Sequence, residues 1–233
     1  MTIRTAKVIF PLLNEVASIN SKRKKVYDVE SFADLVNSGG KKTAELLGKF
    51  FEKHGSDKSA NHSYHYIYAS ILASLGSRGN LLEIGLGTNH VKYVSNMGSR
   101  GKPGASLKAF RDFLPNWNIY GADVDKSILF FDERIKTFFV DQLKENTLDE
   151  LTNQFEEKLN LIIDDGLHSP EANLQVLKFA YSNLKVGGWL IIEDINYSAL
   201  EIWEIVDRLI EANFENFLIN DEGTLVFASR RFR

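Results

Sequence analysis

The chain has 233 residues, of which 44% are apolar and 25% are charged, and its formal net charge is −3. This composition predicts a soluble globular protein that can bury one substantial core, without the basic surface typical of proteins that bind nucleic acids or anionic membranes. The sequence has no cysteine, which excludes disulfides and thiolate metal sites, and no apolar run approaches the ~20 residues of a transmembrane helix.

Residues 1–60 are predicted to form an N-terminal helical cap or an oligomer contact. In this segment, apolar side chains recur at helical spacing in residues 32–36 and 44–51. Residues 61–233 are predicted to form the main domain, because strand and helix patterns alternate regularly from Leu81 onward.

The alternating region contains apolar strands separated by amphipathic helices. The expected strands are 81–85, 118–123, 136–140, 159–164, 188–193, 214–219 and 224–229. The expected helices are 105–114, 126–133, 145–157, 170–184 and 198–212. This alternation indicates a parallel sheet wound by right-handed crossovers. Residues 221–224, Asp-Glu-Gly-Thr, form a hairpin turn signal, so the last strand is predicted to be antiparallel.

The first of these strands ends in a glycine turn. Glu83 is followed by Gly85 and Gly87, and glycine allows both a tight turn and a close approach of the backbone to a ligand. The next strand ends in Asp123, where a carboxylate of a doubly wound fold hydrogen-bonds ribose hydroxyls. The third glycine of a dinucleotide fingerprint is absent. The pattern instead resembles motif I of methyltransferases that use S-adenosylmethionine (SAM).

The whole pattern predicts an α/β fold of class I methyltransferase type. Five βα units followed by an antiparallel hairpin are typical of its seven-stranded, doubly wound, Rossmann-like sheet. Residues 61–233 would then be a class I methyltransferase catalytic domain. One connection, Thr88–Gly104, is longer than this fold needs, and it is either a flexible cover over the cofactor mouth or a mobile surface loop.

Two neighbouring strands end in acidic pairs. Asp164 and Asp165 follow the fourth strand, with His168 close behind, and Glu193 and Asp194 end the fifth strand. Oxygen ligands without cysteine suit Mg²⁺, Mn²⁺ or Ca²⁺. Adjacent strand residues face opposite ways, so both members of a pair can bind one metal only if the chain has turned. Any one of these acids could instead cap the helix that follows.

Several motifs together resemble one family, the metal-dependent sugar O-methyltransferases of macrolide biosynthesis, with the cephalosporin hydroxylase-like proteins as a neighbouring group. The similarity covers about residues 51–200, and its most distinctive part is the Gly-Ser-Arg-Gly-Lys-Pro-Gly segment of the long loop. The motifs are residues 55–58, 62–66, 81–87, 97–107, 120–125, 141–142, 164–168 and 193–195.

The resemblance implies specific roles for residues of this sequence. It implies that Asp165, Glu193 and Asp194 are metal ligands. It implies that His168 is the catalytic base, although a lone histidine is also a common structural hydrogen-bonding residue. The implied cofactor-binding residues are Glu83, Gly85, Gly87, Asp123, Asp141 and Gln142, with Lys58, Tyr64 and Tyr66 facing cofactor or substrate.

We therefore predict a cytoplasmic O-methyltransferase that uses SAM and Mg²⁺ or another divalent cation. Its acceptor would be a hydroxyl of a sugar or a glycosylated metabolite, presented as a metal-chelated diol and deprotonated by a histidine. A catechol-type enzyme acting on an aromatic diol is one alternative. A SAM-fold protein that is not a transferase, such as a binding protein or a hydroxylase-like relative, is another. No nucleic-acid or membrane partner is expected, and a homo-oligomer is possible.

Overall fold

A sheet of nine strands, in the order β1-β8-β9-β7-β6-β2-β3-β5-β4, lies at the centre of the computed structural model. Residues 9–13, 15–16 and 25–233 are described, and the remaining residues of the predicted N-terminal cap lie outside the described residues. The strands are β1 (Val26–Asp28), β2 (Gly79–Ile84), β3 (Trp117–Asp123), β4 (Phe131–Asp132), β5 (Ile135–Phe139), β6 (Leu159–Asp164), β7 (Leu184–Asn196), β8 (Phe214–Asp221) and β9 (Thr224–Arg231).

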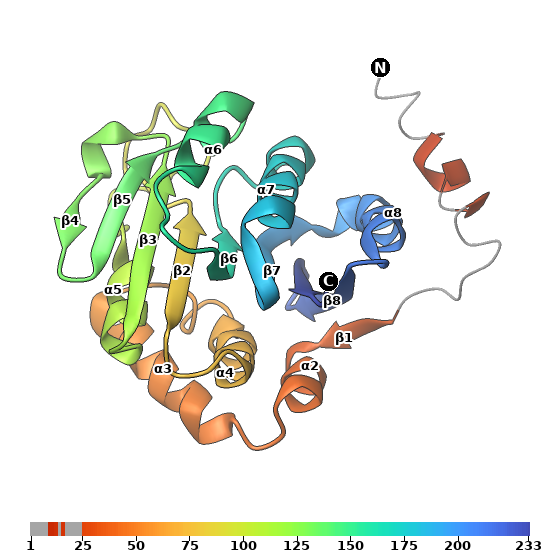
Figure 1. Ribbon diagram of the computed structural model, residues 1–233, viewed down its shortest axis with the longest axis horizontal. Coiled ribbons are helices and arrows are strands. Elements are labelled where there is room, and N and C mark those ends of the chain that lie inside the picture. The colour runs from red at the N-terminus through yellow and green to blue at the C-terminus, as the bar shows by residue number, and fades with distance from the viewer. Residues whose placement is uncertain (1–8, 14, 17–24) are drawn as a thin grey trace.

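Helices cover both faces of the sheet (Figure 1). The helices are α2 (Val29–Val36), α3 (Lys41–His54), α4 (Tyr64–Ser74), α5 (Ala105–Phe113), α6 (Glu145–Thr152), α7 (Pro170–Asn183) and α8 (Leu200–Ile210). Two short 3₁₀ turns, Lys126–Ile128 and Tyr197–Ala199, complete the described elements. None of the helices in this part of the chain is both long and apolar enough to cross a membrane.

The strand pairings confirm the predicted fold class. The five strands β5, β3, β2, β6 and β7 pair in parallel in that order, and β9 is antiparallel to both β7 and β8. The sheet has nine strands rather than the predicted seven because a short strand is added at each edge. β1 pairs in parallel with β8, and β4 pairs antiparallel with β5.

The predicted helix over residues 126–133 is wrong. Only one 3₁₀ turn forms there, and the chain then runs extended as β4. The backbone N–H of Phe130 donates to Thr137 Oγ1 at 2.6 Å, and the Thr137 hydroxyl donates back to the Phe130 carbonyl. These hydrogen bonds tie the segment to β5, so tertiary contacts override its weak local helical spacing.

Side chains alternate between the two faces of the buried strands, as expected for strand geometry. Leu81 and Ile163 pack in the cluster formed with α2, α3, α4 and α5. Leu82 and Ile162 pack in the opposite cluster, with α6, α7 and α8. The parallel strands are therefore apolar on both faces, and their polar residues gather at the strand ends.

The N-terminal helices contribute to the first of these clusters. Phe32 of α2 is fully buried and makes edge contacts with the rings of Trp189 at 6.1 Å and Phe217 at 5.2 Å. Aromatic pairs in this geometry stabilise a core beyond the burial of their area alone.

Replacing this ring tests whether α2 is part of the cooperative core. Phe32→Ala should lower the free energy of unfolding by about 3–5 kcal/mol, because it leaves a cavity between two strands and a helix. Leu35→Ala on the same helix is the control, since Leu35 is 58% exposed and should change stability by less than about 0.5 kcal/mol. Urea unfolding of both variants measures the change in the free energy of unfolding. Equal changes in the two variants would show that α2 is not part of the cooperative core.

Candidate active site

A cavity of about 700 Å³ opens at the carboxyl ends of the central parallel strands. In doubly wound sheets this edge is where ligands bind. The cavity is lined by residues 55–58 before α4, by 84–88 after β2, by 92–97 and 100–102 of the long loop, by 123–124, by 140–143, by 165–168 and by Asp194. It therefore contains most, but not all, of the residues predicted to bind ligands.

Two glycines bring the backbone close to neighbouring segments. Gly85 has φ +99°, and a Cβ there would lie 2.0 Å from the carbonyl oxygen of Asp165. Gly87 has φ +76°, and a Cβ there would lie 2.2 Å from the side chain of Met97. At Gly85 the neighbouring atoms are backbone, so a side chain does not fit there, whereas at Gly87 the positive φ disfavours any other residue. The turn after β2 therefore packs directly on the end of β6, on the same side as the acidic residues.

Asp123 holds this turn in place. Its Oδ2 accepts a hydrogen bond from the N–H of Leu86, and its Oδ1 accepts one from the N–H of Asp125, both at 2.7 Å. Burial raises the pKa of Asp123, and these two hydrogen bonds oppose the rise. Each carboxylate oxygen accepts more than one hydrogen bond, so Asp123 retains acceptor capacity towards the cavity that it lines.

Asp141 and Gln142 line the cavity after β5. Asp141 pairs with Lys144 at 2.8 Å. The Gln142 amide donates to Asp164 Oδ1 at 2.7 Å, and its oxygen accepts from the N–H of Leu167 at 2.9 Å. Gln142 therefore also fixes the turn that follows β6.

The two acids that end β6 have different roles. Asp164 is fully buried, and its second oxygen accepts from Asn173 of α7 at 2.8 Å. Burial raises the pKa of Asp164, and the hydrogen bonds of Asn173 and Gln142 oppose the rise. Asp164 is thus a structural acid, whereas Asp165 lines the cavity.

Asp165, His168 and Asp194 converge in the cavity, with one potential ligand atom from each lying within 4.8 Å of the others. His168 Nε2 is 3.9 Å from Asp165 Oδ1, and its buried Nδ1 has no hydrogen-bond partner among the described residues. His168 and Asp194 both have positive φ, at 54° and 52°. Such strain in non-glycine residues is concentrated at functional sites.

Glu193 is buried beside this group and does not line the cavity with it. The pairing of β7 with β9 shifts register between Ile192 and Ile195, so the strand bulges at the acidic pair. Asp194 faces the cavity, while Glu193 is 1% exposed and accepts hydrogen bonds from Tyr68 and Lys58. Burial, and then the nearby Asp165 carboxylate, raises the pKa of Glu193, although Lys58 opposes the rise.

Lys58 lies among three carboxylates. Its Nζ is 2.6 Å from Asp165 Oδ2 and 3.2 Å from Glu83 Oε1, and it also contacts Glu193. Burial alone would lower the pKa of Lys58, but Asp165, Glu193 and Glu83 raise it well above its ordinary value. Glu83 is fully buried beneath the cavity and accepts from Ser106 Oγ at 2.5 Å. The structure thus places Glu83 against Lys58 rather than in the cavity wall.

The tyrosines of α4 separate into two groups. The Tyr64 hydroxyl donates to Asp194 Oδ1 at 2.5 Å, and the Tyr68 hydroxyl donates to Glu193. Burial is the main cause that raises the pKa of both hydroxyls, so both remain protonated donors. Tyr66 instead lines a separate hollow between α2, α3 and α4.

Sequence reasoning missed two of these residues, Tyr68 and Ser106. Tyr68 could have been found, because it lies four residues after Tyr64 and therefore on the same face of a helix. No local signal identifies Ser106, since its contact with Glu83 joins the start of α5 to the middle of the sheet.

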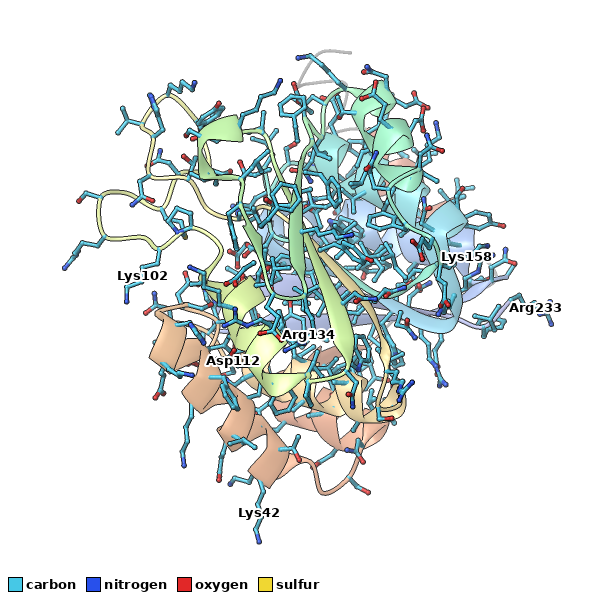
Figure 2. All side chains as sticks on the ribbon, turned by 60° about the vertical axis from the view of Figure 1, so that its left-hand side comes forward. Lys42, Lys102, Asp112, Arg134, Lys158 and Arg233 are labelled. Carbon is cyan, nitrogen blue, oxygen red and sulfur yellow. The ribbon has the colours of Figure 1, made fainter. Side chains whose placement is uncertain are left out.

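The long loop extends across the mouth of the cavity. Hydrogen bonds within it join the N–H of Met97 to the Thr88 carbonyl at 2.8 Å, and the Asn89 amide to the carbonyls of Gly98 and Gly101. Exposed cations of this loop, among them Lys92 and Lys102, line the cavity mouth, and Figure 2 shows Lys102 projecting from the loop. The flexibility predicted for this loop stays a prediction.

Two curated proteins that resemble this chain are named as O-methyltransferases. The chain is 25% identical over 147 residues to the 8-demethyl-8-alpha-L-rhamnosyl tetracenomycin-C 2'-O-methyltransferase of Streptomyces olivaceus, a match that covers 63% of this chain and 36% of that protein. It is 33% identical over 94 residues to the mycinamicin VI 2''-O-methyltransferase of Micromonospora griseorubida, covering 40% and 23%. The chain thus matches only about a third or less of these relatives. No family model matches the sequence.

Solved structures confirm the fold. MycE methyltransferase from the mycinamycin biosynthetic pathway, in complex with Mg, SAH and mycinamycin VI, aligns with a TM-score of 0.65 and 21% identity, covering 80% of this chain and 54% of that one. A putative O-methyltransferase from Klebsiella pneumoniae aligns with a TM-score of 0.52 and 16% identity, covering 82% and 90%. The class I methyltransferase fold and the resemblance to sugar O-methyltransferases are both confirmed.

Asp125 provides a pH test of how the turn and the loop are anchored. Hydrogen bonds from Ser127 and Thr88 lower the pKa of Asp125 from 3.8 to about 2. Because the folded-state pKa is the lower one, Asp125 stabilises the fold at neutral pH, and this contribution is lost as the pH falls through about 4 towards 2. Asp125→Asn should therefore lower the free energy of unfolding by about 1–2 kcal/mol near neutrality, and by progressively less in acid.

Denaturant unfolding of wild type and Asp125→Asn at a series of pH values measures this difference. Asp149→Asn, which alters an exposed acid of α6, is the matched control. A stability difference that stays constant down to the acid limit would show that Asp125 acts through packing rather than through its charge.

Proposed function

We propose that this chain, which has the class I methyltransferase fold and resembles sugar O-methyltransferases in sequence, transfers a methyl group from SAM to a hydroxyl of a sugar or glycosylated metabolite. One observation carries the proposal. Asp165, His168 and Asp194 converge in the same cavity as the glycine turn and Asp123. A site for the methyl donor and a site for activating a hydroxyl are therefore adjacent.

The residues around the glycine turn are suited to hold the cofactor, which supplies an electrophilic methyl group when bound. The turn allows the ligand to approach the backbone closely, because Gly85 and Gly87 lack side chains. Asp123 would accept hydrogen bonds from the ribose hydroxyls with its free lone pairs. Asp141 and Gln142 line the cavity after β5, where we expect the adenine to lie.

The acidic residues fit a divalent cation. Asp165 and Asp194 offer carboxylate oxygens to one point, with His168 beside them, and this oxygen-rich set suits Mg²⁺ or Mn²⁺. Glu193 accepts one hydrogen bond on each carboxylate oxygen, from Tyr68 and Lys58, and each oxygen keeps a second lone pair with which it would join them. When bound, the cation would lower the pKa of the acceptor hydroxyl. A vicinal diol is the acceptor type that this arrangement suits, and both sugars and catechols provide one.

His168 would remove the proton from the acceptor hydroxyl. It lines the cavity beside Asp165 and Asp194, and one ring nitrogen lies buried without a partner among the described residues. Ser169 directly after it caps α7, because its hydroxyl accepts from the N–H of Ala172 at 3.3 Å. The backbone on which the imidazole sits is therefore anchored to a helix, as a general base requires.

Binding and transfer assays test the proposed function. Calorimetry should show binding of S-adenosylhomocysteine and none of NAD, because the turn lacks the dinucleotide fingerprint. Labelled SAM should then transfer its methyl group to glycosides in the presence of Mg²⁺, and EDTA should abolish the transfer. Catechols assayed in parallel distinguish the aromatic alternative. Cofactor binding without transfer to either acceptor class would favour a protein that is not a transferase.

His168→Ala tests the base. Its kcat should fall by about 10²–10⁴-fold, because the hydroxyl loses its proton acceptor, while the affinities for Mg²⁺ and S-adenosylhomocysteine stay close to those of wild type. His90→Ala, which alters an exposed histidine of the loop, is the control. Loss of Mg²⁺ affinity together with rate would make His168 a ligand, and an unchanged kcat would remove it from the mechanism.

A further inference from the structure

Each of the three acids predicted to bind metal contacts a side chain from the segment just before β2. Lys58 contacts Asp165 and Glu193, Tyr68 contacts Glu193, and Tyr64 contacts Asp194. Asp165 follows β6, and Glu193 and Asp194 lie at the bulge of β7, so the acids come more than a hundred residues later, with a separation of 107 residues between Lys58 and Asp165. All four contacts therefore depend on how the N-terminal layer, which consists of α2, α3, α4 and the segment before α4, packs on the sheet.

The segment that provides these contacts is rigidly placed. Ile67 and Ile71 of α4 are buried in the core cluster with α2, α3 and the sheet, and Figure 1 shows α4 lying with these helices on one face of the sheet. At the start of α4, the N–H of Ser63 donates to the Asp221 carboxylate. The Tyr64 and Tyr68 side chains are 2% and 0% exposed, so packing holds both hydroxyls where they meet the acids.

Lys58 places a positive charge among acids that would otherwise repel one another. It is 1% exposed and contacts Glu83, Asp165 and Glu193. Carboxylates this close together are stable in the ionised form only beside a compensating cation. The ammonium group of Lys58 offsets this repulsion and holds Asp165 and Glu193 in place through direct contacts, while Asp165 still lines the cavity.

We propose that Lys58, Tyr64 and Tyr68 are positioning residues that hold Asp165, Glu193 and Asp194 in the arrangement required for a divalent cation. The segment before the parallel sheet is then an integral part of the metal site. This inference rests on the proposed function and extends it to residues that contact neither the methyl group nor the acceptor. Groups that orient metal ligands typically affect metal affinity by 10–100-fold when they are removed.

Removal of single hydroxyls on α4 tests the proposal. Tyr64→Phe and Tyr68→Phe each delete one hydrogen bond to an acid and preserve the ring that packs in the core. Tyr66→Phe deletes a hydroxyl from the same helix that lines a different hollow and is the matched control. Mn²⁺ binding followed by electron paramagnetic resonance, S-adenosylhomocysteine binding by calorimetry and the melting temperature are measured for each variant without any acceptor.

We expect Tyr64→Phe and Tyr68→Phe to weaken Mn²⁺ binding by about 10–100-fold, with S-adenosylhomocysteine affinity unchanged and Tyr66→Phe like wild type. The Lys58→Met variant should lose Mn²⁺ binding altogether. This substitution also leaves buried acids unpaired, and if the variant does not fold, the two tyrosine variants alone test the inference. Lower melting temperatures with wild-type Mn²⁺ affinity in both tyrosine variants would overturn the inference and leave the proposed function standing. A wild-type protein that binds S-adenosylhomocysteine but no Mn²⁺ would overturn the inference together with the metal-dependent part of the proposed function.

Discussion

The buried ammonium group of Lys58 is the interaction on which the rest of the site depends. Three carboxylates, from β2, from the end of β6 and from the bulge of β7, lie within contact of it. Among the ion pairs of the described residues, no lysine or arginine other than Lys58 contacts them, and only His168 approaches Asp165, at 3.9 Å. A buried charge without a partner is strongly destabilising. Lys58, which comes from the segment before α4, therefore offsets the repulsion among these converging acids.

The same convergence requires glycine in the turn after β2. The turn after β2 passes so close to the end of β6 that a Cβ at Gly85 would overlap the Asp165 carbonyl. The glycine turn and the acidic cluster are thus parts of one closely packed unit. A methyl donor bound over this turn would lie next to Asp165, which is the proximity that methyl transfer between two bound molecules requires.

The N-terminal layer has two separate functions in this arrangement. Its apolar residues, such as Phe32 and Leu47, complete one face of the core, and its polar residues reach through that face to the acids. A boundary at residue 60, between a cap and a catalytic domain, stays a prediction. The contacts of Lys58 nevertheless show that residues on both sides of this boundary meet at one site.

Sequence patterns alone predicted the seven main strands of the sheet, its antiparallel end and the edge at which the polar residues gather, but not the two short edge strands. These features follow from periodicity, glycine turns and the rule that parallel strands present their carboxyl ends together. The helix predicted over 126–133 failed because its spacing was weak and hydrogen bonds to Thr137 held the segment extended.

Which acids line the cavity became clear from the folded structure. Asp164 and Asp165 are adjacent, as are Glu193 and Asp194, and strand periodicity alone does not distinguish the members of either pair, although the family resemblance singled out Asp165. The bulge in β7 and partners from distant segments set the direction of each side chain. Long-range packing also placed Tyr68 and Ser106 against buried acids. The orientation of a side chain at a strand end depends on contacts that are local in space and remote in sequence, so no pattern within one segment could predict it.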